Sequence, residues 1–519
     1  MRSEIYGRKS AIEILKAVES NIESVMLGIF GRRRIGKTYL VDEYFKDESS
    51  YFYIKNVGIK NGPVQSQINI FEADINERVD NFNEELKTIL ISRGGEEQGC
   101  EVIKEKVGSK TWEDFFRFLS KTIDNLQQSI LTNVLDRKIV YFFDEVPYAA
   151  ENSENFSNRL AAIWEKGFKT KKNLIFILCG SAASWMIKEI ANARGGLNFR
   201  CKHKIHLRPF SYSEAIDYLK QKYNYNFQNE IDGVKTYMSI GGVAKYLDLY
   251  NDKKKMMFSQ SITELMFSDF KDMREEFDLL MDSIFRNAKV HKELIQYLSQ
   301  KGKGASKKDI EADLQKKGYR ESEVKRAIGE LIDCDYVMEM QLVHNKGIGT
   351  VFRLIDEYSK FYFKWLHNKG EENFQSDANY WNNEAHNSKI WFGAAFEVFC
   401  FRNKDRIKQL LELKRFNTKF FSLYINHTGG AECDMIVEAT IAQKIHGVFI
   451  VENKFKEGEK FSINAAELNI LNKKIRVLKQ AKKYAIDPQI VFVTSDGVME
   501  NENLKSINPS SFTIAQLRR

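Results

Sequence analysis

Short apolar runs alternate with helical patterns over residues 1–210. Runs of this length predict buried strands, and the segments between them carry apolar residues three or four positions apart, as amphipathic helices do. Strands that alternate with helices predict a doubly wound α/β sheet with a ligand site at the carboxyl ends of its strands. Residues from about 59 to 110 are polar and weakly patterned, which predicts a surface insertion. The apolar runs are 25–30, 51–54, 139–143 and 174–179.

The remaining chain divides into four segments by the same pattern. Residues 211–286 are helical, begin with a Ser-x-x-Glu capping box and are expected to form a lid. Residues 287–356 predict three short helices and a β-hairpin, which is the layout of a winged helix. Residues 357–386 predict a helical linker, and residues 387–519 predict a helix, three strands, a helix and a strand. The fold class is therefore multidomain α/β.

Composition agrees with several globular domains. A chain of 519 residues is too long for one core. The formal net charge of +8 permits binding to nucleic acid without indicating it. The six scattered cysteines predict reduced thiols, and the N-terminus carries no signal-peptide pattern, so a cytoplasmic protein is expected. No apolar run reaches the roughly 18 residues of a membrane span, so no membrane partner is expected.

The chemistry that organises the chain directly follows the first apolar run. Gly31 and then Gly36, Lys37 and Thr38 form the pattern G-x-x-x-x-G-K-[ST] between a predicted strand and a predicted helix. The glycines allow backbone N–H groups to face phosphate oxygens at a helix N-terminus. Lys37 is expected to reach the β- and γ-phosphates, and Thr38 to ligate Mg²⁺. Arg34, within the loop, is a further candidate nucleotide-binding residue, and the pattern predicts ATP and Mg²⁺ as cofactors.

A second part of the nucleotide site follows the run at 139–143. Asp144 is expected to hold the Mg²⁺ shell, and Glu145 to orient and deprotonate the attacking water. Ser181 follows the next apolar run, where it is either a sensor of the γ-phosphate or a plain turn serine. Arg200 is a candidate arginine finger, one of several arginines in its neighbourhood.

These segments resemble the archaeal-type ATPase family, which is similar to the STAND signal-transduction ATPases within the AAA+ group. The resemblance implies that Tyr6, Gly7 and Arg8 lie against the adenine. The chain departs from the family at Phe199, where the family has glycine before the arginine, and at Ala244, where the family has proline. The motifs that carry the resemblance are Gly-Arg-Arg-Arg-Ile-Gly-Lys-Thr, Phe-Phe-Asp-Glu, Gly-Ser at 180–181 and Leu-Arg-Pro-Phe-Ser at 207–211.

The last quarter of the chain contains acidic residues beside a lysine. Glu397 lies in a wholly apolar helical segment, where an unpaired carboxylate is costly. It therefore either pairs with a buried base or ligates a metal. Asp434 lies in the second predicted strand of this region, and the third ends in Glu452-Asn453-Lys454. Period-two alternation places Glu452 and Lys454 on the same face of that strand.

This arrangement resembles the PD-(D/E)XK nuclease superfamily, the restriction-endonuclease-like fold. By that resemblance, Asp434, Glu452 and the Asn453 carbonyl hold Mg²⁺, Glu397 supports the metal or its waters, and Lys454 positions the attacking water. Phosphodiester cleavage does require hard oxygen ligands for Mg²⁺ and a cation near the nucleophile. Either the site is intact and cleaves, or the nuclease fold is degenerate and only binds.

The sequence thus predicts a protein that binds and hydrolyses ATP and whose nucleotide state controls a C-terminal metal-dependent nuclease-like domain. Its expected partner is nucleic acid, with DNA favoured, and formation of a homo-oligomer is a further expectation. The basic residues of the predicted winged helix either meet phosphates, or this segment serves as a lid or a protein contact. The alternative function is an ATP-driven regulatory switch with an inactive nuclease-like domain.

Overall fold

The computed structural model has two compact units, Met1–Arg208 and Pro209–Arg519, and each unit has its own sheet and core. Some predicted features lie outside the described residues: the turn at 345–346, Gly429, and residues 368–384 of the linker. The structure describes residues 5–92, 102–132, 135–151, 153–181, 184–191, 196–251, 258–267, 272–285, 287–344, 347–367, 385–425 and 430–518.

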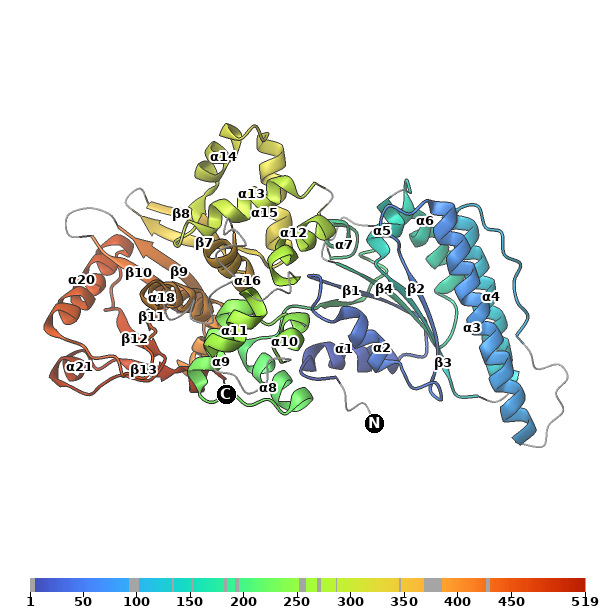
Figure 1. The fold of residues 1–519 in the computed structure, drawn as a ribbon, viewed down its shortest axis with the longest axis horizontal. Helices are drawn as coiled ribbons and strands as arrows, with labels where there is room; N and C mark the ends of the chain where they lie inside the picture. The colour runs from blue at the N-terminus through green and yellow to red at the C-terminus, as the bar shows by residue number, and fades with distance from the viewer. Residues whose placement is uncertain are drawn as a thin grey trace. The chain divides into compact units, whose positions relative to one another are not determined.

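The first unit is built on a five-stranded sheet in the order β2-β3-β4-β1-β5 (Figure 1). Neighbouring strands are parallel at every pairing, which confirms the predicted parallel α/β sheet. The strands are β1 (Val25–Gly31), β2 (Tyr51–Val57), β3 (Lys138–Asp144), β4 (Leu174–Ser181) and β5 (His203–His206). The longer helices are α1 (Lys9–Glu19), α2 (Lys37–Tyr44), α3 (Val64–Ser92), α4 (Trp112–Thr132) and α6 (Phe156–Ile163).

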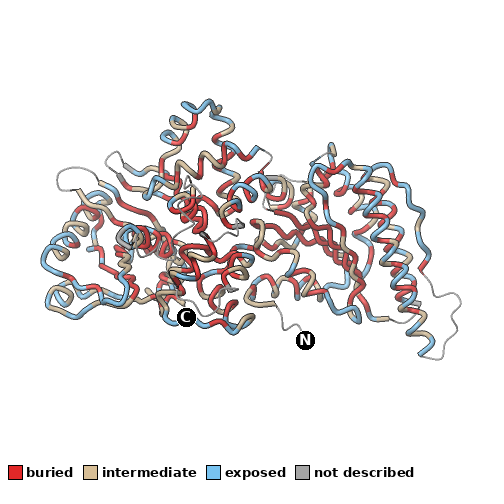
Figure 2. The backbone as a smooth tube through the Cα atoms, in the orientation of Figure 1, coloured by how far each residue is buried: buried red, intermediate tan, exposed pale blue. Residues whose placement is uncertain are grey.

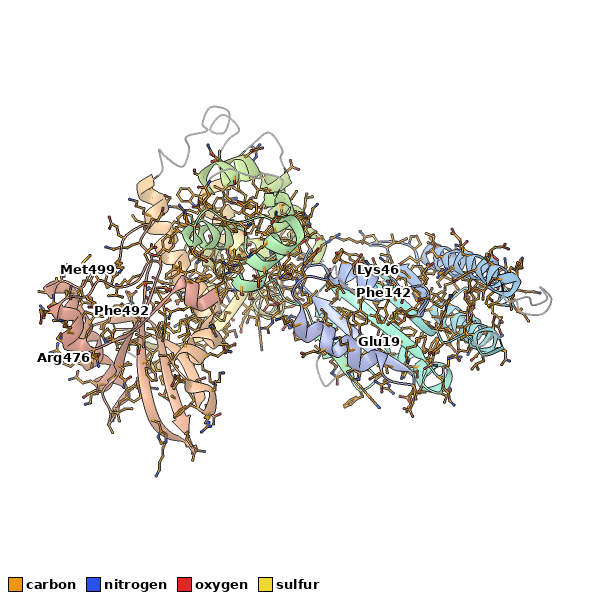
Figure 3. All side chains as sticks on the ribbon, turned by 90° about the horizontal axis from the view of Figure 1, so that it is seen from below. Glu19, Lys46, Phe142, Arg476, Phe492 and Met499 are labelled. Atoms are coloured by element: carbon orange, nitrogen blue, oxygen red, sulfur yellow. The ribbon has the colours of Figure 1, made fainter. Side chains whose placement is uncertain are left out.

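β1, β3 and β4 are apolar over nearly their whole length because helices cover both faces of the sheet. Ile139, Tyr141 and Phe143 of β3 pack into one core cluster with residues of α3 and α4. Val140 and Phe142 point to the other face and pack with α1 and α2. Figure 2 colours the central strands of this sheet largely as buried residues, and Figure 3 labels Phe142 within the sheet. Strand alternation therefore divides the core of this unit into two layers.

The prediction of a surface insertion at about 59–110 is wrong for most of this segment, because much of it packs into the core. Residues Val64–Ser92 form the long helix α3, which packs on α4. Between its many polar residues, the sequence of α3 has apolar residues at regular spacings of three and four. This is the pattern of a helix with one face in the core. The stripe consists of Ile68, Phe71, Ile75, Val79, Phe82 and Leu86, all of which are buried.

The second unit begins with helices, as predicted for a lid. The capping box at Ser211 is present: its hydroxyl accepts from the Glu214 N–H, and the Glu214 carboxylate accepts from the Ser211 N–H. Gly241 ends α9 with a φ of 68°, a positive value that favours glycine. The helices are α8 (Tyr212–Tyr223), α9 (Glu230–Ile240), α10 (Ala244–Asn251), α11 (Phe258–Phe267) and α12 (Asp272–Ile284).

Three helices and a hairpin follow, in the order predicted for 287–356. Ser306 caps α14 by accepting a hydrogen bond from the Asp309 N–H. The pattern of elements is present, and its assignment as a winged helix stays a prediction. The elements are α13 (Lys289–Ser299), β6 (Ala305–Ser306), α14 (Lys307–Lys316), α15 (Glu321–Asp333), β7 (Val337–His344) and β8 (Gly347–Leu354).

The C-terminal elements also follow the predicted order of helix, three strands, helix and strand. β9, β10 and β11 are antiparallel, and β12 lies parallel to β11. Figure 3 labels Phe492 of β12, which belongs to the core of this sheet. The elements are α18 (Ala385–Arg402), β9 (Asn417–Tyr424), β10 (Glu432–Ile441), β11 (Lys444–Lys454), α20 (Ala465–Lys482), β12 (Gln489–Thr494) and β13 (Ser510–Thr513).

The hairpin β7-β8 and the C-terminal strands form one sheet rather than two. β7 pairs with β9 in parallel, from Gln341 opposite Phe421 to His344 opposite Tyr424. The result is an eight-stranded mixed sheet in the order β13-β12-β11-β10-β9-β7-β8-β6. The sequence pattern predicted separate domains at 287–356 and 387–519, whereas the hydrogen bonds between β7 and β9 join the two segments in one sheet. Side chains of the hairpin segment are thereby held beside the C-terminal strands.

We expect Phe71→Ala to lower the free energy of unfolding by about 3–5 kcal/mol, because it empties a fully buried site. The Phe71 ring packs against Trp112, Phe115 and Phe143. Ile70→Ala is the matched control, since Ile70 is 45% exposed on the same helix. Urea unfolding of the full chain measures both changes, and equal effects of the two substitutions would contradict the packing of α3 into the core.

Candidate functional site

In the loop after β1, Gly31 and Gly36 adopt conformations that leave the backbone N–H groups open to a ligand. Gly31 has a φ of 155°, and a Cβ at this position would lie 2.0 Å from the Leu207 carbonyl oxygen. Gly36 opens α2 with a φ of 89°, and Arg34 also has a left-handed φ of 68°. Residues of alternating handedness turn successive N–H groups towards one side, which forms an anion-binding nest. The local structure is therefore that of a phosphate-binding loop.

Lys37, Thr38 and Asp144 converge at this loop. The buried Lys37 ammonium donates to the carbonyls of Gly31 at 3.1 Å and Arg32 at 2.9 Å, so it lies across the loop. The Thr38 hydroxyl donates to Asp144 Oδ2 at 2.6 Å. A hydroxyl and a carboxylate at this separation are hard oxygen donors that fit Mg²⁺. The start of α2 and the end of β3 thus supply the residues that were predicted to hold nucleotide and metal.

Glu145 and Ser181 meet beside this group. The Ser181 hydroxyl donates to both carboxylate oxygens of Glu145 at 3.3 Å, and the Ser181 N–H donates to Oε2 at 3.4 Å. Glu145 has a left-handed φ of 47° at the turn after β3. Ser181 is therefore in direct contact with the predicted catalytic carboxylate. Both interpretations of Ser181, as a phosphate sensor and as a turn serine, stay open.

The N-terminal segment is anchored to the loop by Arg8. Its guanidinium donates to the Ile35 carbonyl at 2.8 Å and to the Arg208 carbonyl. Gly7 and Arg8 both have left-handed φ values, of 63° and 60°. These contacts bring the predicted adenine-binding segment, which includes Tyr6, next to the phosphate-binding loop.

Arg200 is placed differently from the other predicted nucleotide-site residues. Its Nε lies 3.2 Å from Glu165 Oε1, and its Nη1 donates to the Gly196 carbonyl at 2.7 Å. Neither contact connects it with the phosphate-binding loop. Its assignment as an arginine finger stays a prediction.

The predicted acidic residues of the second unit line one cavity of about 540 Å³. Glu397 comes from α18, Asp434 from β10, and Glu452 and Lys454 from β11. α20 closes the other side with Lys473 and Lys474, so that the cavity mixes carboxylates with ammonium groups. The full lining is Gly393, Glu397, Gly430, Ala431, Glu432, Asp434, Glu452, Asn453, Lys454, Phe455, Lys456, Ile470, Lys473 and Lys474.

Strand register brings Asp434 to Glu452. Met435 of β10 pairs with Val451 of β11, so the preceding Asp434 lies opposite Glu452 on the neighbouring strand. Residues opposite each other across two antiparallel strands have Cβ atoms about 4.5–5.5 Å apart. The register between β10 and β9 shifts between Cys433 and Ile436, and such an irregularity re-aims side chains.

Glu452 is held by two lysines. Lys474 Nζ lies 2.5 Å from Glu452 Oε1, and Lys454 Nζ lies 3.7 Å from Oε2. Burial alone lowers the pKa of Lys474, but the Glu452 carboxylate more than offsets this and raises it. The tighter ion pair is therefore made by Lys474, a residue that the sequence analysis missed. Its signal was a lysine on the apolar face of α20, three residues after Leu471 and four before Leu478.

Glu397 pairs with a buried base, one of the two outcomes expected for it. Arg353 of β8, whose side chain is only 5% exposed, lies 3.0 Å from Glu397 Oε2. Burial and then the nearby Asp434 charge raise the pKa of Glu397 above its ordinary value. Arg353 was also missed, although a charged residue inside the apolar strand pattern Val-Phe-Arg-Leu-Ile was its signal.

Asp434 faces a third cation. Lys303 Nζ lies 3.1 Å from Asp434 Oδ1 and also contacts Glu432. Burial alone lowers the pKa of Lys303, but Asp434, Glu397 and Glu432 together raise it above its ordinary value. Lys303 stands between two glycines in a polar stretch, so the sequence carried no signal for it.

The carboxylates of the cavity have the donor chemistry of a site for a hard divalent cation. In the described part of the chain, no three His, Cys, Asp or Glu side chains are gathered closely enough to hold a metal ion as they stand. The ion pairs explain this, because Glu397, Asp434 and Glu452 each point to an internal cation. The carboxylate oxygens are of a kind that binds Mg²⁺, but in this structure they are directed to lysine and arginine side chains.

Residues 5–249 match the family model of an ATPase domain predominantly from Archaea. The chain carries an archaeal-type ATPase domain. The match extends beyond the first unit into α10. No curated protein matches the chain. Across the described ranges, no helix has the length and apolar character needed to cross a membrane.

Solved structures show weak overall similarity. The Walker-type ATPase PABY2304 of Pyrococcus abyssi is 13% identical with a TM-score of 0.49, over 70% of this chain and 97% of that chain. The ORC2 protein of Aeropyrum pernix, in ADPNP–ADP complexes, is 14% identical with a TM-score of 0.36, over 70% and 94%. Drosophila ORC bound to DNA is 15% identical with a TM-score of 0.27, over 64% and 87%.

Arg353→Met is expected to lower the free energy of unfolding of the second unit by about 2–4 kcal/mol, because it leaves the partly buried Glu397 carboxylate without its closest cation. Adding Glu397→Gln should recover most of the loss, since the neutral amide does not need that cation. Urea unfolding measures the three chains. Arg320→Ala, which removes an exposed partner of Glu323, is the control and should change nothing measurable. A loss that Glu397→Gln does not reduce would contradict this pairing.

Proposed function

We propose that this chain is an ATP-hydrolysing switch whose nucleotide state controls a metal-dependent nuclease-like domain acting on nucleic acid, with DNA favoured. The observation that carries the proposal is the cavity in which Glu397, Asp434 and Glu452 meet Lys454 and Lys474. The archaeal-type ATPase domain supplies the switch. The fold proposed for 387–519 is restriction-endonuclease-like, and the order and direction of β9, β10, β11 and β12 support it.

In the ATPase reaction, each residue of the first site has a role that follows from its position. Lys37 would bind the β- and γ-phosphates, while Thr38 and Asp144 would hold Mg²⁺, which would supply positive charge at those phosphates. Glu145 takes a proton from the attacking water, and Ser181 holds the Glu145 carboxylate. Arg200 acts as a finger only where it reaches another nucleotide site, which is consistent with the proposed homo-oligomer.

In the cleavage reaction, Asp434, Glu452 and the Asn453 carbonyl hold the divalent cation, and Glu397 supports its waters. That cation, when bound, supplies a Lewis acid to the scissile phosphate. Lys454 and Lys474, on either side of Glu452, orient the attacking water and neutralise charge that develops on the phosphate oxygens. The proposed winged helix at 287–356 presents basic side chains for the nucleic-acid backbone. The proposed location of the protein is the cytoplasm.

The second candidate function is an ATP-driven regulatory switch whose nuclease-like domain binds without cleaving. The internal ion pairs favour it, because Lys303, Arg353 and Lys474 already neutralise the carboxylates that metal binding requires. Cleavage assays separate the two functions.

For the ATPase site, we expect Lys37→Ala to abolish ATP binding and Glu145→Gln to keep binding while slowing hydrolysis by about 10²–10⁴-fold. Binding of a fluorescent ATP analogue and release of phosphate measure the two steps. Lys46→Ala, which changes an exposed lysine after α2, is the control and should alter neither step. Normal hydrolysis in Glu145→Gln would show that another residue activates the water.

For the nuclease-like site, we expect the full chain to nick supercoiled plasmid or cut single-stranded DNA with Mg²⁺ or Mn²⁺, at a rate that ATP or Lys37→Ala changes. Glu452→Gln and Lys474→Ala should reduce cleavage to background, because they remove a metal ligand and its neighbouring cation. Lys479→Ala, on the exposed side of α20, should leave it unchanged. Cleavage that survives Glu452→Gln rules out this site, whereas absent cleavage with intact ATP hydrolysis establishes the non-cleaving switch.

A further inference from the structure

Lys303 is not one of the residues that line the cavity of the second unit, yet its ammonium reaches three of the carboxylates that do. Its ammonium lies 3.1 Å from Asp434 Oδ1 and 3.7 Å from Glu397 Oε2, and it contacts Glu432 as well. It comes from the turn between α13 and β6, far in sequence from all three acids. The side chain is 39% exposed, so solvent reaches it while it contacts the acids.

The backbone of this turn fixes where Lys303 points. Gly304 has a φ of 84°, and its N–H donates to the Lys301 carbonyl at 2.8 Å. A Cβ at Gly304 would lie 2.7 Å from the Phe352 carbonyl oxygen, so the turn is pressed against β8. The next residue on β8 is Arg353, which holds Glu397. Two neighbouring cations from residues 287–356, the helix–hairpin segment, therefore reach acids of α18 and β10.

An ammonium group and a divalent cation compete for the same carboxylate oxygens. Asp434 and Glu397 cannot direct those oxygens to Mg²⁺ while they neutralise Lys303, and two cations at such a separation repel strongly in a partly buried cavity. Lys474 differs in this respect, because its side chain is 13% exposed and lies on a packed helix, whereas Lys303 lies on a turn. Of these two lysines, Lys303 is the one that a small local movement can withdraw.

We propose that Lys303 is an internal counter-ion that closes the carboxylate cavity, and that divalent metal binds with full affinity only when Lys303 withdraws. The inference rests on the proposed function, since it takes Asp434 and Glu397 as metal-directed residues. The turn leads directly into α14, whose first residues are Lys307 and Lys308. A ligand that moves α14 therefore also moves the cation that closes the cavity.

The test is binding of Mn²⁺ to the full chain without nucleotide, followed through the electron paramagnetic resonance of free Mn²⁺. Lys303→Gln should tighten the Asp434-dependent site by about tenfold or more, because it removes one positive charge from the acids. Lys303→Arg keeps the charge and should bind Mn²⁺ as the unchanged chain does. Lys301→Gln is the matched control: it removes an equal charge from the same turn, and its ammonium instead lies over the Tyr297 ring.

Asp434→Asn identifies which Mn²⁺ belongs to the cavity, and its combination with Lys303→Gln should lose the tightened binding. Equal or weaker Asp434-dependent affinity in Lys303→Gln overturns the role of Lys303 while leaving the metal site in place. Equal tightening by Lys301→Gln also overturns it, because a general charge effect is then sufficient. Absence of any Asp434-dependent Mn²⁺ in every chain instead removes the proposed nuclease function, and the inference with it.

Discussion

The second unit depends on charge balance in one partly buried cavity. Glu397, Glu432, Asp434 and Glu452 lie together there, and carboxylates in such a place are costly unless cations or hydrogen bonds accompany them. Lys454 lies on β11 beside Glu452, and the other three cations come from further elements: Lys303 from the turn before β6, Arg353 from strand β8 and Lys474 from helix α20. The helix–hairpin segment is therefore part of the electrostatics of the C-terminal strands, and the pairing of β7 with β9 gives the same connection through the backbone.

The first unit must also accommodate negative charge, and it does so mainly through backbone geometry. Its phosphate-binding loop uses glycines at Gly31 and Gly36, one of them because the Leu207 carbonyl leaves no room for a Cβ. Its acidic residues need fewer internal cations, because Asp144 accepts from the Thr38 hydroxyl and Glu145 from Ser181. Neutral donors release a carboxylate to a metal or a water more readily than a charged partner does. The two sites therefore differ in how easily they accept their ligands.

Sequence reasoning succeeded where the determinants are local. The loop at Gly31–Thr38, the strands beside it and the cap at Ser306 each depend on residues close together in the chain. It failed for α3, because only about one residue in three or four of this helix belongs to the apolar stripe, so the average composition of the segment is polar. The helical period of the apolar residues was the signal that an average does not show. Sequence reasoning also missed Lys303 and Arg353, which contact Glu397 from a segment that is distant in sequence, and no local pattern specifies the pairing of β7 with β9 that joins the two segments.

The three cations differ in how easily each could move away from its carboxylate partner. Lys474 is set by a helix whose apolar face packs into the core around Leu471 and Leu478, so moving it away from Glu452 requires displacing that helix. Arg353 is almost fully buried within strand β8. Lys303 is held by a short turn and is the most exposed of the three. Withdrawing Lys303 therefore requires the least rearrangement of the packed structure, so it is the cation that an incoming positive charge would displace first.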